Sequence, residues 1–175
     1  MTQLVALSLS IGILGGIATF VFLKFLTSYL IWAAFIAWGC YFATGGNNEA
    51  LKNTIVCNVF GAIVAWVAAL ILVSVPMGDT LGMPLWAGIV VGATVLVVCL
   101  AAHVKALATI PASVYGYASV FAFLLGGGGA NLTKDSLMSA SPKQNALIAV
   151  AVSMVIGALF GLLSGKMGGA LTKKA

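Results

Sequence analysis

Six long apolar stretches, separated by short polar or glycine-rich connections, dominate the pattern of this chain. They cover residues 4–23, 26–44, 54–75, 85–102, 106–125 and 146–163. A helix needs about 20 apolar residues to cross the hydrocarbon core of a bilayer, and each stretch reaches or approaches that length. The pattern predicts an all-α, polytopic membrane protein with six transmembrane helices.

Residues that end or begin helices lie in the connections. Residues 76–84 contain two prolines and two glycines, and the longest connection, 126–145, opens with four successive glycines. Such a run ends a helix, because glycine adopts many backbone conformations. Asn131 or Thr133 is expected to cap a short interfacial helix in this connection, and Pro142 is expected to begin the last span.

Three segments of the first half of the chain align with three segments of the second half. Residues 9–20 match 85–96, residues 36–43 match 115–122, and residues 58–65 match 154–161. Each half holds three spans, which is an odd number, so the second half enters the membrane in the opposite direction. We therefore predict two inverted three-helix repeats. In secondary transporters built in this way, the solute path lies between the repeats.

The repeats also set the expected domain boundaries. The first repeat covers residues 1–75, a linker covers 76–84, the second repeat covers 85–165, and a basic cytoplasmic tail covers 166–175. Hydrophobic residues make up 62% of the chain and charged residues 6%, whereas a soluble domain carries about 25% charged residues. This composition leaves no room for a soluble catalytic domain.

Charge and candidate chemistry exclude several classes of protein. All eight basic residues are lysines at span ends or in connections, so the net charge of +5 reflects membrane topology instead of nucleic-acid binding. Cys40, Cys57 and Cys99 lie far apart in the sequence, as is typical of small buried residues. No phosphate-binding loop, dinucleotide fingerprint or metal-ligand spacing occurs. We expect no enzymatic activity, no cofactor and no metal.

No predicted span carries a central charged residue, and all three acidic residues lie in connections. Ion-coupled transporters usually keep a carboxylate within the membrane. Its absence favours passive conduction of a neutral solute, although backbone carbonyls can also bind sodium. Asn58 is the deepest amide in a span, and it either bonds a neighbouring helix or contacts a solute. His103, the only histidine, either gates a cytoplasmic mouth or marks a helix end.

Small residues recur at intervals of four, a spacing that places them on one face of a helix. The glycines concerned are Gly12, Gly16, Gly61, Gly88, Gly92, Gly157, Gly161 and Gly165. Helix backbones approach closely at such residues within membranes. These stripes either pack the helices of one molecule together, or they form the interface of a homo-oligomer or a close-packed pore wall.

Aromatic residues gather in the second and fifth spans, which align with each other. The candidates for a solute path are Trp32, Phe35, Trp38 and Tyr41 in the second span, Pro111, Tyr115, Tyr117 and Phe121 in the fifth, and Asn58 in the third. Pro111 leaves two alternatives. It breaks its helix, so that the paired spans line a solute path, or it begins an ordinary helix whose aromatic residues fill the core and the membrane interface.

Two motifs carry a resemblance to a known family: FIAWGCYFATGG at residues 35–46 and IPASVYGYASVFAF at residues 110–123. From about residue 9 to residue 165, the chain resembles an uncharacterised bacterial inner-membrane family catalogued as domain of unknown function 1097. The resemblance implies a bacterial inner-membrane location and no established substrate. The paired layout is also similar in general plan to urea transporters and aquaporin-type channels, but the chain lacks the Asn-Pro-Ala signature of aquaporins.

These features favour a homo-oligomeric channel or facilitator that passively transports a small, uncharged polar solute, such as a urea-like or amide-like molecule. Its expected partners are the lipid bilayer, the solute and further copies of the chain. Two other interpretations are an ion-coupled secondary transporter, which would use backbone carbonyls at broken helices, and a non-transporting membrane scaffold or accessory subunit, which would bind a partner helix through its glycine stripes.

The lysines predict an orientation, because cytoplasmic loops carry an excess of positive charge. With a cytoplasmic N-terminus, the cytoplasmic side holds Lys52, Lys105, Lys166, Lys173 and Lys174, and the other side holds Lys24, Lys134 and Lys143. This distribution favours both termini in the cytoplasm.

A reporter fused after Ala175 tests this orientation. We expect a reporter that is active only in the cytoplasm to be active in this fusion, because the basic C-terminal residues should be retained there. Activity of an export-dependent reporter at the same position would contradict the orientation.

Overall fold

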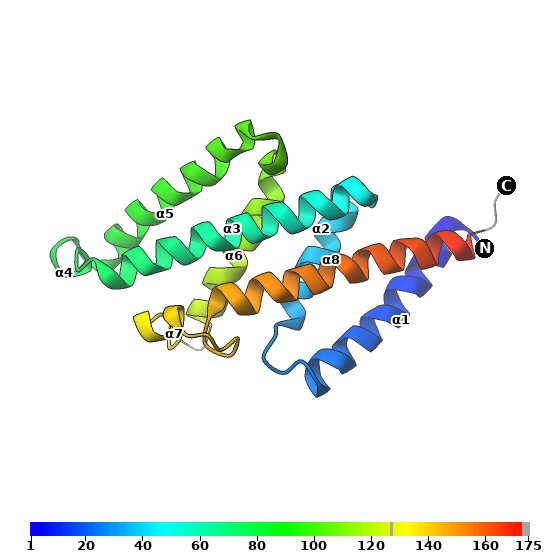
Figure 1. Ribbon diagram of the computed structural model, residues 1–175, viewed down its shortest axis with the longest axis horizontal. Helices are drawn as coiled ribbons and strands as arrows, with labels where there is room; N and C mark the ends of the chain where they lie inside the picture. The colour runs from blue at the N-terminus through cyan, green and yellow to red at the C-terminus, as the bar shows by residue number, and fades with distance from the viewer. Residues whose placement is uncertain (127, 173–175) are drawn as a thin grey trace.

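The computed structural model describes residues 1–126 and 128–172, and this part of the chain is helical with no strand. Figure 1 shows the arrangement of the helices. They are α1 (Gln3–Lys24), α2 (Ile31–Ala43), α3 (Asn48–Ser74), α4 (Gly78–Leu81), α5 (Met83–Leu100), α6 (Ile110–Leu125), α7 (Lys134–Met138) and α8 (Ala146–Leu171), with two 3-10 turns, η1 (Ala101–His103) and η2 (Lys105–Leu107). The predicted all-α class is confirmed.

Four of these helices, α1, α3, α5 with the turn that follows it, and α8, are long and apolar enough to cross a membrane. The helices α2 and α6 are apolar but shorter, with 13 and 16 residues. At 1.5 Å per residue they rise by about 20 and 24 Å, which is less than the hydrocarbon thickness of about 30 Å. The structure thus contains four candidate membrane-spanning helices and two shorter apolar ones.

The two long helices α3 and α8 begin at asparagine caps. The Asn47 side chain accepts a hydrogen bond from the backbone N–H of Ala50 at 2.8 Å, so α3 begins six residues before the predicted span. The Asn145 side chain accepts hydrogen bonds from the N–H groups of Leu147 and Ile148. Asn145, and not Pro142, therefore begins the last helix. An asparagine side chain satisfies N–H groups that a helix start leaves free.

Other boundaries partly match the predictions. Thr133 caps α7, as expected for a short helix in this connection. The predicted linker 76–84 holds α4 and the first two residues of α5. Most of the predicted tail, 166–175, belongs to α8, which continues through Lys166 to Leu171. Lys173 and Lys174 lie outside the described residues.

Pro111 begins α6 and does not break it. It lies in the first turn of a continuous helix, where its missing N–H would have no partner within the helix. The helix α2 is continuous as well. Of the two alternatives, Pro111 therefore begins an ordinary helix and neither short helix is broken; the irregular backbone instead precedes each of them, at residues 25–30 and 101–109.

The helices form two layers. In Figure 1, α3 and α8 run in opposite directions in front of α2 and α6, while α1 and α5 lie at opposite flanks. The packing is reciprocal: α3 packs mainly on α6, and α8 packs mainly on α2, while α1 lies against α8 and α5 against α3. Each long helix of the front layer thus packs on the short helix from the other half of the chain.

Glycines bring these crossing helices into backbone contact. A Cβ atom built on Gly61 of α3 would overlap the carbonyl oxygen of Ser113 of α6. A Cβ on Gly157 of α8 would likewise overlap the carbonyl oxygen of Ala34 of α2. The sequence alignment pairs Gly61 with Gly157, so both halves use the same position for the same close approach.

The eight predicted glycines therefore separate into two groups. Gly61, Gly157, Gly161 and Gly165 pack against other helices within the molecule. Gly12, Gly16, Gly88 and Gly92 are exposed, and a Cβ atom on any of them would meet nothing within 4 Å. The stripes on α3 and α8 pack the molecule itself, whereas those on α1 and α5 face outward.

A larger side chain should destabilise the protein at a glycine of a helix crossing, but not at an exposed glycine. Gly157→Leu should lower the free energy of unfolding by about 3 kcal/mol or more, because the Ala34 backbone cannot move aside cheaply. Gly39→Leu, at an exposed glycine of α2 where a Cβ atom would meet nothing within 4 Å, is the matched control and should have little effect. Thermal unfolding of the detergent-solubilised protein measures both, and equal losses of stability would contradict this packing.

Candidate functional site

Trp38, one of the predicted path residues, is buried between α2, α1 and α8. Its indole N–H donates to the Ser164 hydroxyl at 2.9 Å. Its ring stacks on Phe35 and on Phe160, each with a centroid distance of 5.6 Å. It belongs to a small apolar cluster that includes Leu14 of α1. These contacts are typical of a core residue.

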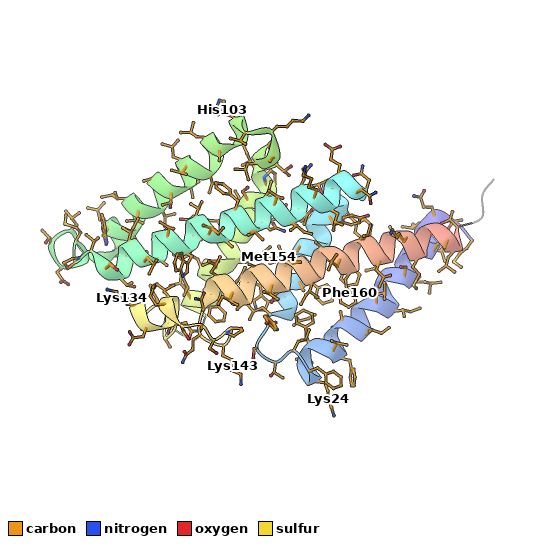
Figure 2. The ribbon with its side chains drawn as sticks, in the orientation of Figure 1. Lys24, His103, Lys134, Lys143, Met154 and Phe160 are labelled. Atoms are coloured by element: carbon orange, nitrogen blue, oxygen red, sulfur yellow. The ribbon has the colours of Figure 1, made fainter. Side chains whose placement is uncertain are left out.

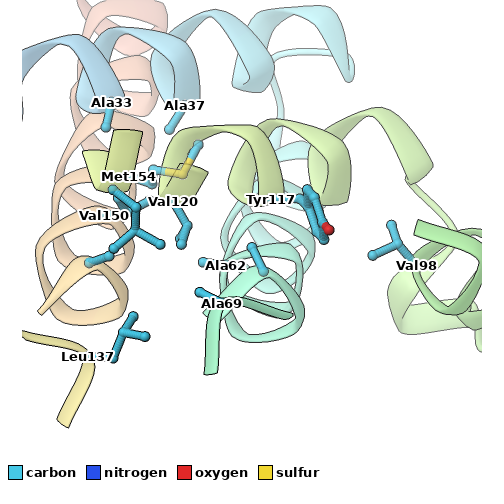
Figure 3. Close-up of a cluster of buried hydrophobic side chains, with 13 residues drawn as sticks. Ala33, Ala37, Ala62, Ala69, Val98, Tyr117, Val120, Leu137, Val150 and Met154 are labelled. Atoms are coloured by element: carbon cyan, nitrogen blue, oxygen red, sulfur yellow. The ribbon is translucent and has the colours of Figure 1, made fainter. Parts of the chain in front are cut away.

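Tyr117, which aligns with Trp38, occupies a different cluster. Its hydroxyl forms a 2.7 Å hydrogen bond with Thr94 of α5, and its ring lies 5.3 Å from that of Phe121. Its apolar neighbours include Val98, also on α5 (Figure 3). The structure does not bring Trp38 and Tyr117 together, so these two residues do not form one constriction.

The remaining path candidates on α2 and α6 lie in different environments. Trp32 and Tyr115 line a shared apolar groove of about 330 Å³ between α2 and α6. Phe35 and Pro111 are exposed on these helices. Tyr41 is buried, and its hydroxyl donates to the Gly46 carbonyl at 2.6 Å.

Asn58 stands out among the predicted residues. Its side chain is 1% exposed, and among the described residues neither its amide nitrogen nor its amide oxygen has a hydrogen-bond partner. It lies where α3 meets α6, because a Cβ on Gly116 would overlap the Asn58 carbonyl oxygen. Burying an unpaired polar group costs about 1–3 kcal/mol in proteins, so this amide requires an explanation.

Further small polar side chains lie along the same helix crossing and the neighbouring turn of α3. Ser113 of α6 is fully buried, and its hydroxyl also lacks a partner. One helical turn before Asn58, the hydroxyl of Thr54 lies 3.3 Å from that of Thr44 and 3.6 Å from the Cys40 sulfur. Cys57 contacts Cys40 and donates to the Ala106 carbonyl at 3.6 Å. We call these residues the polar cluster: Cys40, Thr44, Thr54, Cys57, Asn58 and Ser113.

Two of the corresponding positions in the other half are apolar, although Cys57 aligns with Ser153 and Cys40 with Ser119, which are both buried polar residues. The alignment pairs Asn58 with Met154, and its continuation along the same helix pairs Thr54 with Val150. Both Met154 and Val150 are buried in the main hydrophobic core, as Figure 3 shows. Since the same helix crossing accepts apolar side chains in one half, packing alone does not require polar residues in the other.

The polar cluster offers neutral hydrogen-bonding groups. The Asn58 amide supplies two N–H donors and a carbonyl acceptor, and each hydroxyl can donate and accept. None of its members is charged. Among the described residues, no three His, Cys, Asp or Glu side chains gather closely enough to hold a metal ion. The chemistry available here is recognition of an uncharged polar molecule.

Sequence reasoning selected Asn58 but missed Ser113 and Thr44 as its companions. The available signal for Ser113 was a difference between aligned positions, because it corresponds to Ala34 when the alignment is continued. Ser119, one turn beyond Gly116 on α6, is another buried hydroxyl without a partner, and it was missed in the same way.

A family model described as "Protein of unknown function (DUF1097)" matches residues 8–169. The chain belongs to the DUF1097 family. The match confirms the resemblance carried by residues 35–46 and 110–123, and it covers the whole polar cluster. No curated protein and no solved structure matches this DUF1097 chain.

The core position of Trp38 changes what its removal should do. Trp38→Ala should lower the free energy of unfolding by about 3–5 kcal/mol, because it removes a buried ring and its hydrogen bond to Ser164. Trp32→Ala, at a residue that is 36% exposed, is the control and should cost much less. Unfolding in mixed micelles, monitored by circular dichroism, measures the loss of stability in both variants. A stable Trp38→Ala protein would contradict the core assignment.

Proposed function

We propose that this DUF1097 protein is a passive membrane channel or facilitator for a small, uncharged polar solute of the urea or amide type. The observation that carries the proposal is the Asn58 amide, which is buried at a helix crossing without any partner. A group that is costly to bury in the empty protein becomes useful when a solute supplies the missing hydrogen bonds.

The chemistry of the polar cluster matches such a solute. A urea-like or amide-like molecule carries N–H donors and a carbonyl acceptor, which complement the Asn58 amide and the Ser113 hydroxyl. Ions are disfavoured, because the polar cluster contains no charge to replace their hydration. The expected result is selectivity for neutral molecules.

We further propose that the six apolar helices form two inverted three-helix repeats, α1–α2–α3 and α5–α6–α8. Reciprocal packing of α3 on α6 and of α8 on α2 supports this architecture. So does the matching contact of Gly61 with Ser113 and of Gly157 with Ala34. In this architecture, the irregular segments at 25–30 and 101–109 lie at the two membrane interfaces and lead into the short helices α2 and α6.

The proposed location is a bacterial inner membrane, with both termini in the cytoplasm. Lys24, Lys134 and Lys143 lie along one edge of the molecule and His103 lies at the opposite edge (Figure 2), which agrees with the two sides expected from the lysine distribution. We also propose a homo-oligomer. The outward glycines of α1 and α5 support it, since small residues allow close contact between helices in membranes.

Solute flux into proteoliposomes tests the function through Asn58→Val. This change should slow the flux of the preferred neutral solute about tenfold or more, the equivalent of losing one or two hydrogen bonds. It should also leave stability unchanged or raise it, because it removes an unpaired buried amide. Stopped-flow light scattering with a panel of small neutral solutes measures flux, and thermal unfolding measures stability.

Met154→Leu, at the aligned position, is the matched control and should leave the flux unchanged. A large loss of stability in Asn58→Val would show that the amide is structural. Wild-type flux in a stable Asn58→Val protein would exclude Asn58 from the path. An absence of flux for every solute would favour a scaffold over a transporter.

A further inference from the structure

A second polar feature, distinct from the polar cluster, lies between the start of α3 and the turn η2. It is a cavity of about 530 Å³, lined by Glu49, Lys52, Asn53, Lys105, Ala106 and Ala108. We call it the lysine cavity. It lies at the ends of apolar helices, where a membrane interface would be, and η2 packs directly against α3.

The lysine cavity carries uncompensated positive charge. Neither Lys52 nor Lys105 forms a salt bridge with a carboxylate among the described residues. Glu49 is the only acidic residue in its lining, so the lining is basic by one charge. The Asn53 amide adds hydrogen-bond donors. Two ammonium groups and an amide around one cavity suit a phosphate group with a single negative charge.

The chain just before Lys105 carries exposed apolar side chains. Val104 of the connection before η2 is 56% exposed, and Leu96 and Leu100 on the outer face of α5 are 58% and 55% exposed. An acyl chain beside these residues would bring its headgroup to the level of Lys105. A free anion would make no use of this apolar surface, whereas a phospholipid would use both parts.

We propose that the lysine cavity binds the headgroup of an anionic phospholipid. Lys52 and Lys105 hold the headgroup phosphate from two different elements, α3 and η2, and the Asn53 amide donates to it. The acyl chains lie along Val104, Leu100 and Leu96. Basic pockets at the ends of membrane helices recognise anionic lipids in this way. The binding does not depend on whether the protein conducts a solute.

Native mass spectrometry of the purified protein tests this site with phosphatidylglycerol and phosphatidylcholine as probes. The wild type should retain phosphatidylglycerol in preference to phosphatidylcholine. The double variant Lys52→Gln/Lys105→Gln should bind phosphatidylglycerol about 30-fold more weakly, as expected for losing two interfacial lysines. Lys24→Gln/Lys143→Gln removes the same charge at the opposite edge and should bind as the wild type does.

Glu49→Gln should have the opposite effect on lipid binding. It removes the negative charge from the lysine cavity and should tighten phosphatidylglycerol binding about fivefold. Since this variant gains binding, misfolding cannot produce the expected result. Equal loss in both double variants, or equal retention of the two lipids by the wild type, would overturn the proposal. Complete displacement of phosphatidylglycerol by an equal concentration of inorganic phosphate would overturn it in favour of a free-phosphate site.

Discussion

Backbone contact between crossing helices is the constraint on which this structure depends. At Gly61 and Gly157, α3 and α8 approach the carbonyl groups of α6 and α2 so closely that no side chain fits between them. In an apolar solvent, such contact is a main source of helix association, because lipid gives no hydrophobic drive for helices to come together. The two crossings join the halves of the chain more firmly than either half is joined internally.

The same contact places the polar cluster. Because Gly116 has no side chain, the Asn58 backbone lies against α6, and its amide is enclosed at the crossing instead of reaching water. Ser113 is held at the next contact, where its carbonyl meets Gly61. A tight crossing leaves little freedom to the side chains beside it, so the hydrogen-bonding groups are arranged before any solute arrives. Preorganisation of this kind lowers the entropic cost of binding.

The sequence predicted the helical class and the six apolar segments, since these follow from hydropathy, and it singled out Asn58 because amides are rare in spans. It did not predict where α3 begins, because the Asn47 cap extends the helix into a polar connection. Nor did it predict that Trp38 and Tyr117 lie apart. In the inverted repeat that we propose, equivalent residues meet only near the symmetry axis, and alignment alone does not reveal which residues lie there. Trp32 and Tyr115, which do meet, occupy positions that do not align.

The shortness of α2 and α6 has a consequence for the surrounding lipid. Their rises of about 20 and 24 Å leave an apolar band about 6–10 Å thinner than an average hydrocarbon core. Lipids next to their exposed faces must compress or tilt to match this band, at a cost of fractions of a kcal/mol for each ångström. The cost of this mismatch would therefore be lowest in thin or easily deformed bilayers, and a thicker bilayer would become thinner around the protein. A thinner barrier is also a lower one for any polar molecule that crosses beside these helices.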